Sequence, residues 1–571
     1  MASQRIPVAT YRLQLNRQFR FSDAIGLVPY LHRLGISDLY TSPIFRARPG
    51  STHGYDVTDS TSLNPELGLE SDFEALVQEL KGREMGLLLD IVPNHMAASP
   101  DNSWWTDVLE HGASSPFAEY FDIDWNTSGE HLSYRRFFDI NELVGVRVEV
   151  PQVFEATHSL IMKLVREGKI TGLRVDHIDG LYDPLAYLQR LQTHLAPEAP
   201  DDGAGFYIIV EKILASGEEL PGEWPVSGTT GYDFLNTVNA LFVDAKGLPA
   251  LDEGYSQFIG SPIVFGDVVY HRKKLVIERL FSSEIAALGQ ELANLARQNR
   301  ASASFSLPEL TGTLIEITAC LPVYRTYIRD DNVSARDRFY LRQAFQAALK
   351  LNPDIERAAG FLKQVLYLDF LPTLTGEQKE AWRHFVLKWQ QLTGAIMAKG
   401  FEDTALYNYN RLVSLNEVGG DPGSAGTSVV DFHHCNLKRR EGWPHTLNAT
   451  ATHDTKRSED VRARIDVLSE IPEKWQQHLL RWYQWNIPKK RKVHGSPVPE
   501  PNMEVLLYQT MLSAWPLMFL PATRKISVSA PDSLVAVSTS STIISVLPPW
   551  RGLPTIPSTF MFLPPLTNIS C

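Results

Sequence analysis

The sequence predicts an α/β fold, a (β/α)8 TIM-type barrel that carries a large helical insertion. Apolar runs of strand length alternate with amphipathic helical stretches over residues 6–233. Two of these runs, residues 86–92 and 206–210, are almost continuously apolar, as expected for parallel strands that are buried on both faces. Polar residues follow several of the runs directly, and in barrels this end of the strands carries the active site.

The elements of the first half follow from local spacing of apolar residues. We expect strands at residues 6–15, 38–42, 86–92, 170–176 and 206–210, and helices at residues 21–34, 70–81, 153–167 and 184–195. Pro29 can kink or restart the first helix. Residues 228–233 (GTTGYD) predict the next strand-to-loop turn. Residues 94–141 are rich in aromatic side chains, which either form a local core or stack on sugar rings.

The second half is less regular. Residues 264–399 consist of long amphipathic stretches without strand-like runs, which predicts a helical subdomain inserted into the barrel sequence. The α/β pattern returns at residues 445–452, which end in His453-Asp454. We therefore divide the chain into residues 1–95 (first barrel strands and helices), 96–150 (a shortened loop subdomain), 151–262 (barrel core with the catalytic strands), 263–425 (helical insertion), 426–518 (barrel continuation) and 519–571 (an atypical tail).

The bulk composition restricts the class of partner. Hydrophobic residues make up 44% and charged residues 21% of the 571 residues, as in soluble globular proteins. A formal net charge of −12 argues against nucleic acid or an anionic membrane as the main partner. Three separated cysteines, and no signal or membrane-spanning run, predict a cytoplasmic protein. His433-His434-Cys435 could bind a metal, but no second cluster has zinc-site spacing, so we expect no metal.

The pair Arg174 and Asp176 is the centre of the predicted site. On a strand, residues two apart point to the same face, so these side chains should lie together. A fixed positive charge lowers the pKa of a carboxyl group, and an ionised, immobile carboxylate suits a nucleophile in glycosyl transfer. The alternative is a structural ion pair at a strand end.

Further polar groups stand at the ends of other strands. They are Asp90 with Asn94-His95, Glu211, and His453 with Asp454. Each alone has an ordinary explanation, since most histidines are structural and a glutamate can cap a helix. In this order and at these strand ends, they predict two carboxylates that converge on one glycosidic bond.

Four segments carry a resemblance to a known superfamily. LLLDIVPNH (87–95), GLRVDH (172–177), IIVEK (208–212) and THD (452–454) resemble the signature regions of the α-amylase superfamily of glycoside hydrolases. The segments YRLQL (11–15), TSPIFRARPGSTHGYDV (41–57), YRRFFDIN (134–141), SGTTGYDF (227–234), MAKGFEDTALYNYNRL (397–412), NEVGGDP (416–422) and ATHDTKRSEDVRAR (451–464) resemble, more narrowly, the maltooligosyl trehalose synthases. This resemblance extends from residue 6 to about residue 517.

The resemblance implies an isomerase, a (1->4)-alpha-D-glucan 1-alpha-D-glucosylmutase that acts in trehalose biosynthesis. Such an enzyme converts the reducing-end α-1,4 linkage of a maltodextrin into an α,α-1,1 linkage. The family pattern implies that Asp176 is the nucleophile, Glu211 the general acid and then base, and Asp454 the group that stabilises the oxocarbenium-like state. The implied substrate-binding residues are Tyr55, Asp90, His95, Arg174 and His453. The implied pathway partner is maltooligosyl trehalose trehalohydrolase.

The physical requirements of this chemistry agree with the assignment. A retaining double displacement needs two carboxyl groups about 5–5.5 Å apart, which adjacent strands can supply, and it needs no metal or cofactor. Glu211 would have to hold a proton near neutral pH, which burial or the charge of Asp176 would favour. Transfer instead of hydrolysis requires that water is excluded and the cleaved glucose is held. We expect the helical insertion with Lys399 and Tyr409 to do this.

Two departures from the family pattern leave alternatives open. Between Trp125 and Tyr134 the family carries a longer segment than the NTSGEHLS found here. Residues 519–571 match nothing in the family, and beyond Arg524 they contain only three charged residues, Lys525, Asp532 and Arg551. A barrel without its last strand has open edges, so we expect marginal stability. The alternatives are an α-glucan hydrolase of the amylase type and an inactive glucan-binding product.

Overall fold

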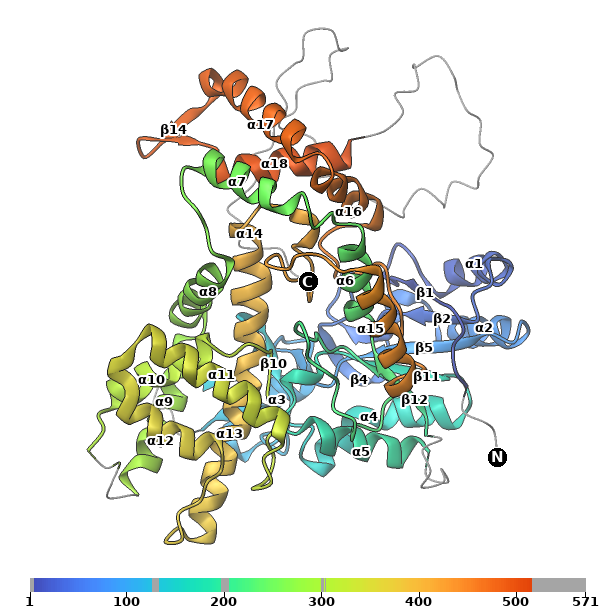
Figure 1. The fold of residues 1–571 in the computed structure, drawn as a ribbon. Coiled ribbons are helices and arrows are strands. Elements are labelled where there is room, and N and C mark those ends of the chain that lie inside the picture. Colours follow the sequence, from blue (N-terminus) through green and yellow to red (C-terminus); the bar gives the residue numbers. More distant parts are fainter. Residues whose placement is uncertain (1–4, 126–132, 197–204, 299–301, 303, 516–571) are drawn as a thin grey trace. The chain divides into compact units, whose positions relative to one another are not determined.

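A curved sheet of six parallel strands organises the first part of the chain (Figure 1). The computed structural model describes residues 5–125, 133–196, 205–298, 302 and 304–515. The strands lie side by side in their order along the chain, as the early strands of a (β/α)8 barrel do. They are β1 (Thr10–Leu13), β2 (Asp38–Thr41), β5 (Gly86–Ile91), β11 (Gly172–Val175), β12 (Tyr207–Val210) and β13 (Gly228–Thr229). This architecture confirms the predicted incomplete barrel with a helical insertion.

Burial explains why these segments form the sheet. Every residue of β2, β5, β11 and β12 is buried, as expected for parallel strands covered on both faces. The register pairs Arg174 on β11 with Asp90 on β5, so the sheet itself brings these two side chains together. The predicted strands are confirmed. Strands β2, β5 and β12 are one residue shorter than predicted, and β1 and β11 are shortened by more.

The helices that cover the sheet are close to those predicted. They are α1 (Phe21–Leu34), α2 (Glu70–Lys81), α4 (Pro151–Arg166), α5 (Pro184–Leu195) and α6 (Tyr232–Leu241). Helix α1 continues through Pro29 and buries Phe21, Val28 and Leu31. Helix α5 begins at Pro184 because the side chain of Asp183 accepts a hydrogen bond from the Ala186 amide at 3.0 Å.

The segment of residues 445–452 is a correction to the sequence analysis. We expected the α/β pattern to resume there, but the structure assigns no strand to these residues. The Leu447 amide donates to the Thr229 carbonyl at 3.3 Å, while the Thr229 amide donates to the side chain of Thr446 at 3.0 Å. A side-chain acceptor thus replaces the backbone carbonyl that a regular ladder would use. Among the described residues, no further strand pairs with the outer side of this segment.

The helical insertion forms a second core of its own. Its helices are α8 (Phe265–Leu280), α9 (Ser282–Arg297), α10 (Leu307–Ala319), α11 (Ala335–Leu351), η4 (Pro353–Ile355), α12 (Glu356–Leu366), α13 (Gly376–Met397) and the π-helical turn η5 (Ala398–Ala405). Their buried apolar side chains make a cluster separate from that of the sheet. The insertion also makes polar contacts with the first half, for example where Gln391 in the last part of α13 donates to the Gly180 carbonyl in the loop after β11 at 2.9 Å. The insertion therefore touches the loops at the ends of the strands.

The remaining elements are short or lie after the insertion. They are β3 (Phe45–Ala47), β4 (Val57–Leu63), η1 (Pro65–Leu67), β6 (His95–Ala97), α3 (Ser103–His111), η2 (Gly112–Ser114), β7 (Ile123–Asp124), β8 (Ser133–Tyr134), β9 (Arg136–Phe137), β10 (Ile140–Gly145), η3 (Ile178–Gly180), α7 (Leu248–Ile259), α14 (Leu406–Asn408), η6 (Val413–Leu415), α15 (Val429–Gly442), α16 (Glu459–Asp466), η7 (Val467–Ser469), α17 (Pro472–Asn486), η8 (Ile487–Lys489), β14 (Arg491–Val493), β15 (Ser496–Val498) and α18 (Pro501–Ala514). No helix among the described residues is both long and apolar enough to cross a bilayer. The atypical tail of residues 519–571 and most of the shortened segment after Trp125 lie outside the described residues.

Candidate active site

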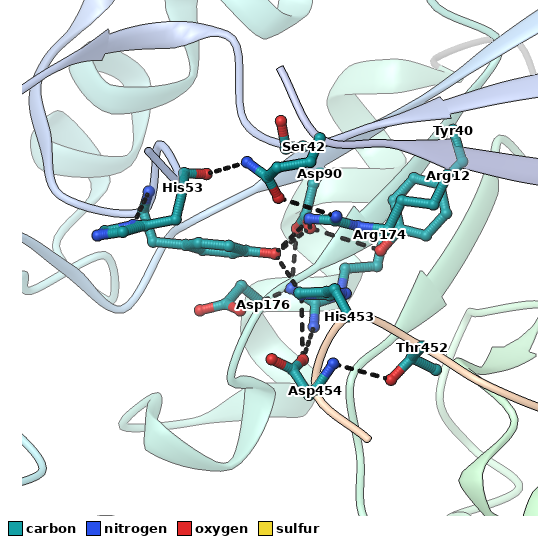
Figure 2. A network of polar contacts seen from close by, with 12 residues as sticks. Arg12, Tyr40, Ser42, His53, Asp90, Arg174, Asp176, Thr452, His453 and Asp454 are labelled. Carbon is teal, nitrogen blue, oxygen red and sulfur yellow. Dashed lines mark hydrogen bonds and ion pairs between the residues drawn. The ribbon is translucent and has the colours of Figure 1, made fainter. Parts of the chain in front are cut away.

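The guanidinium of Arg174 is the centre of a polar cluster at the carboxyl ends of the strands (Figure 2). Its Nη1 lies 2.8 Å from Asp90 Oδ1 and 2.6 Å from Asp176 Oδ1. Its Nη2 lies 3.2 Å from Glu211 Oε1 and 3.9 Å from Asp454 Oδ2. One buried cation therefore gathers four carboxylates from three strands and a distant loop. This arrangement brings the three predicted catalytic residues together.

Exposure separates the carboxylates into two kinds. The side chain of Asp90 is completely buried, whereas the side chains of Asp176, Glu211 and Asp454 are 9%, 20% and 27% exposed. Only the last three can therefore be reached from solvent. Asp90 contacts Arg174, and its substrate-binding role stays a prediction. Arg174 is itself only 1% exposed, and its two terminal nitrogens contact these carboxylates.

Glu211 is positioned by backbone hydrogen bonds as well as by Arg174. Its amide continues the sheet by donating to the Val175 carbonyl at 2.9 Å. Its Oε2 accepts a hydrogen bond from the His177 amide at 2.7 Å. His177 has a φ of 46°, in the left-handed region. Gly180 lies against it, because a Cβ there would come within 2.3 Å of the His177 ring.

Tyr55 and His453 close one side of the cluster. The Tyr55 hydroxyl donates to Asp90 Oδ2 at 2.6 Å and lies 2.7 Å from His453 Nε2. The two rings are nearly parallel, with centroids 5.9 Å apart. His453 Nε2 also lies 3.0 Å from Asp454 Oδ2. Tyr55 thus connects the strand end at Asp90 with the loop that carries Asp454.

His95 lies under an aromatic cover. The Phe137 ring stacks on it with a centroid distance of 4.0 Å, and both Phe137 and Phe138 contact His177 edge-on. Among the described residues, His95 Nε2 is buried without a hydrogen-bond partner. Burial and the neighbouring His177 and Arg135 lower the pKa of His95 well below its usual value, so the ring is neutral.

Most of the aromatic side chains of residues 94–141 form a local core, which is one of the two alternatives that the sequence left open. In this core the rings of Trp104, Phe117, Tyr120, Trp105, Phe121 and Tyr134 contact one another. The last two aromatic side chains of the segment, Phe137 and Phe138, belong to the site instead.

The two residues predicted from the second half lie in different places. Lys399 lies on η5, with its Nζ 4.8 Å from the ring centre of Phe138, which in turn contacts His177. Lys399 also pairs with Asp403 at 3.0 Å. Lys399 therefore lies at the edge of the candidate site.

Tyr409 is not brought to the site. It is 4% exposed, and its ring packs against Tyr255 and Phe265 in a core between α7, α8 and the segment after η5. This buried position gives no support to its predicted substrate-binding role, which stays a prediction. The pattern MAKGFEDTALYNYNRL contains several aromatic residues, and the sequence could not indicate which of them faces a core.

The protonation of the site differs from the sequence-based expectation. Burial and the charge of Glu211 raise the pKa of Asp176 well above its usual value, although Arg174 acts in the opposite direction. The expectation of a lowered pKa is therefore wrong for the substrate-free site. Burial and Glu211 also raise the pKa of Asp454 to about 6. Carboxylates this close titrate as a group, and the raised pKa values of Asp176 and Asp454 favour the uptake of protons by this group.

Several contributors were missed by the sequence analysis. Arg12 on β1 donates to the Tyr55 hydroxyl at 3.1 Å, and Tyr40 on β2 donates to Asp90 at 3.4 Å. Tyr232 donates to Asp454 at 3.4 Å. The signal for Arg12 and Tyr40 was their place on predicted strands, since these strands end at the same edge as β5.

The arrangement can perform acid–base and nucleophilic chemistry on a neutral ligand. Three partly exposed carboxylates surround Arg174, which contacts Asp176 through Nη1 and Glu211 through Nη2. Among the described residues, no group of three or more His, Cys, Asp or Glu side chains is arranged to hold a metal ion. Paired carboxylates of this kind are the machinery of retaining glycoside chemistry.

Comparison with known proteins agrees with this geometry. Residues 24–203 match the family model of the α-amylase catalytic domain. A protein of Mycobacterium tuberculosis (strain ATCC 25618 / H37Rv) with the name "Putative maltooligosyl trehalose synthase" is 33% identical over 579 aligned residues, which cover 89% of this chain and 70% of that protein.

Solved structures of similar proteins lead to the same family. The maltooligosyltrehalose synthase of Arthrobacter ramosus superposes with a TM-score of 0.78 at 34% identity, covering 90% of this chain and 70% of that one. A structure from Sulfolobus tokodaii, described as a hypothetical maltooligosyl trehalose synthase, superposes with a TM-score of 0.71 at 34% identity and the same coverage of both chains.

Proposed function

This chain belongs to the family of the maltooligosyl trehalose synthases, and we propose that it uses the Arg174 cluster for intramolecular transglycosylation. The reaction converts the α-1,4 linkage at the reducing end of a maltodextrin into an α,α-1,1 linkage. The observation that carries the proposal is the contact of one guanidinium with both Asp176 and Glu211. The two carboxylates follow adjacent parallel strands, and this arrangement supports their joint action on one anomeric carbon.

In the first half-reaction, Asp176 attacks the anomeric carbon of the penultimate glucose from the β face. Glu211 donates its proton to the glycosidic oxygen, and the C–O bond breaks to release the terminal glucose. The product is a β-glycosyl ester on Asp176. Asp176 must be ionised to attack, so the proton of the carboxylate group must reside on Glu211 when substrate is bound.

In the second half-reaction, Glu211 acts as a base. It takes the proton from the anomeric hydroxyl of the released glucose, whose oxygen then attacks the anomeric carbon of the glycosyl ester. The bond between this carbon and the Asp176 carboxylate breaks, and Asp176 leaves as a carboxylate. Two inversions give net retention, and the bond formed joins two anomeric carbons. The released glucose must rotate within the site without leaving it, so that its anomeric hydroxyl faces the ester. Water has to be excluded during this time.

The remaining residues of the site would hold the sugars. Asp454 and His453, which lie 3.0 Å apart, would bind ring hydroxyls and stabilise the positive charge of the transition state. His95 Nε2 is a buried polar atom that a sugar hydroxyl could satisfy. Tyr55 would stack on the ring, and Lys399 beside Phe138 would face the released glucose.

Product analysis tests the proposed function. Purified protein is incubated with maltopentaose, and reducing ends and total saccharide are followed together. We expect reducing ends to disappear while the chain length stays the same, and an NMR spectrum with an α,α-1,1 linkage. An increase of reducing ends without any such linkage would identify an amylase-type hydrolase instead.

The product suggests the next enzyme. A chain that ends in trehalose is a substrate for a hydrolase that cleaves beside that unit, so we propose maltooligosyl trehalose trehalohydrolase as the pathway partner in trehalose biosynthesis.

We also propose a cytoplasmic location, which the separated free cysteines Cys320 and Cys435 support. A copurification experiment and cell fractionation would test these two proposals.

A further inference from the structure

Lys212 is a buried cation directly after the proposed acid–base residue. It follows Glu211 at the end of β12, and only 2% of it is exposed. Successive residues of an extended chain point to opposite sides, so Lys212 points away from the carboxylates that Glu211 faces. Nothing in the proposed mechanism uses this charge. Since a buried charge is costly, its contacts require an explanation.

The ammonium of Lys212 joins the two catalytic loops. Its Nζ lies 3.2 Å from Asp179 Oδ2, in the loop after β11, and 3.1 Å from Glu218 Oε1, in the loop after β12. It also donates to the Ile213 carbonyl at 2.9 Å. Burial lowers the pKa of Lys212, but the charges of Asp179 and Glu218 outweigh this effect and raise it above its usual value. Lys212 is therefore charged.

The helical insertion surrounds this ion cluster. The ring centres of Tyr324 and Tyr327 lie 5.4 Å and 5.8 Å from Lys212 Nζ. The Tyr327 hydroxyl donates to Asp179 Oδ1 at 2.5 Å. Arg325 donates to the Asp179 carbonyl at 2.6 Å. The segment after α10 therefore binds both the side chain and the backbone carbonyl of Asp179.

These contacts make a continuous path from the insertion to the reacting groups. Asp179 is three residues from Asp176, and Lys212 is bonded to Glu211 in the chain. A displacement of the segment of residues 324–327 would therefore move both loops together.

We propose that Lys212 is a positioning residue that couples the helical insertion to Glu211 and thereby favours transfer of the sugar over hydrolysis. The inference rests on the proposed function, because it concerns the partition between transfer and hydrolysis. The reason is geometric: transfer requires Glu211 to meet a sugar hydroxyl at a fixed place, whereas water can approach from many directions. If Glu211 is held less firmly, the rate of transfer should fall more than the rate of hydrolysis.

The direct test replaces Lys212 with Met, which keeps the length of the side chain and removes the charge. With maltopentaose as substrate, we expect kcat to fall about tenfold or more, KM to change less than about threefold, and the hydrolysed fraction of product to rise at least about threefold. Lys212→Arg, which retains the charge, should restore part of the transfer.

A matched control separates positioning from simple destabilisation. Lys490 lies between η8 and β14, away from the catalytic loops, and its side chain is only 6% exposed. Its Nζ lies 2.5 Å from the buried carboxylate of Glu504 on α18. Lys490→Met should lower the melting temperature and leave the product ratio of the folded protein unchanged. If folded Lys212→Met has the same kcat and product ratio as Lys490→Met, the proposal is wrong.

A milder variant covers the case in which Lys212→Met does not fold. Tyr327→Phe keeps the ring and removes only the hydroxyl that donates to Asp179, and we expect the hydrolysed fraction to rise about twofold. An unchanged fraction would contradict the coupling. If the unaltered protein forms only reducing sugars, the proposed function fails, while the expected loss in kcat of hydrolysis still tests Lys212.

Discussion

Asp176 and Glu211 are held by a sheet, whereas Asp454 is held by a loop. The amides of Asp176 and Glu211 extend the parallel ladder, donating to the carbonyls of Ile91 and Val175 at 2.9 Å each. Asp454 follows a segment without strand structure and depends on side chains for its position. The same site therefore combines a rigid half and a half that single side chains support.

Glu417 is the main support of the loop half. This carboxylate is completely buried and accepts hydrogen bonds from the amides of Lys456 at 2.6 Å and Arg457 at 3.0 Å, which are two and three residues after Asp454. The side chain of Arg462 also approaches it at 3.5 Å. Glu417 lies in NEVGGDP, far from THD in sequence. Removing a side chain should thus move Asp454 more easily than it moves Asp176 or Glu211.

The largest expected effect comes from the rigid half itself. Asp176→Asn removes the proposed nucleophile, and we expect kcat to fall about 10⁴-fold or more. Because burial raises the pKa of Asp176 in the free protein, the neutral amide should not lower the melting temperature. Initial rates on maltopentaose and a thermal melt measure both quantities. Substantial remaining activity would remove Asp176 from the mechanism.

Glu417→Gln comes next and tests the loop half. An amide NH2 would face backbone N–H groups, so we expect Asp454 to shift and kcat to fall about 10- to 100-fold, equivalent to about 1–3 kcal/mol. Asp38→Asn is the matched control, because Asp38 is equally buried and pairs with Arg5 at 2.6 Å at the start of β2, far from the carboxyl end. Equal losses of activity in both variants would contradict the distinction between the halves.

Tyr55→Phe tests the connection between the halves. Its hydroxyl contacts Asp90 in the sheet and His453 in the loop, and the variant keeps the ring in place. We expect about a tenfold loss of kcat/KM, the cost of leaving buried polar groups unpaired. A change below twofold would mean that the two halves are positioned independently.

The pH dependence should be the smallest effect. The pKa of Asp454 is raised to about 6, so we expect kcat/KM to fall as the pH drops below about 6, where this group takes up a proton. The free energy of unfolding depends on pH in the opposite direction to kcat/KM. The folded protein binds the proton more tightly than the unfolded chain, so the contribution of Asp454 is complete at low pH and is lost as the pH rises through about 6. Melting temperatures of the protein and of Asp454→Asn are compared between about pH 4 and about pH 7, which contains the range in which only the folded protein holds this proton. The two pH profiles should differ in slope, and parallel profiles would contradict the raised pKa.

The sequence predicted the sheet half better than the loop half. Residues 86–92 and 206–210 are apolar runs that only a buried strand explains, so their ends could be located, and with them Asp90 and Glu211. Residues 445–452 mix polar and apolar residues, and their partner at Thr229 is more than two hundred residues away in the chain. A pattern of local spacing carries no information about such a contact.

The same difference explains why individual residues depart from expectation. The raised pKa of Asp176 depends on burial and on Glu211, neither of which a two-residue spacing with Arg174 reveals. Tyr409 was expected at the site because of its motif, but its ring faces Tyr255. Lys212 was visible only as part of IIVEK, since its partners come from two loops and from the insertion.

The central claim is that Asp176 and Glu211 act on one anomeric carbon, and trapping the covalent intermediate tests it most directly. In Glu211→Gln, α-maltosyl fluoride can still glycosylate the nucleophile, because fluoride leaves without an acid, but no base completes the transfer. Intact and peptide mass spectrometry should then find one maltosyl group on the peptide that contains Asp176. A label on the peptide that contains Asp454, or an unlabelled protein that turns over the fluoride with inversion, would contradict the account.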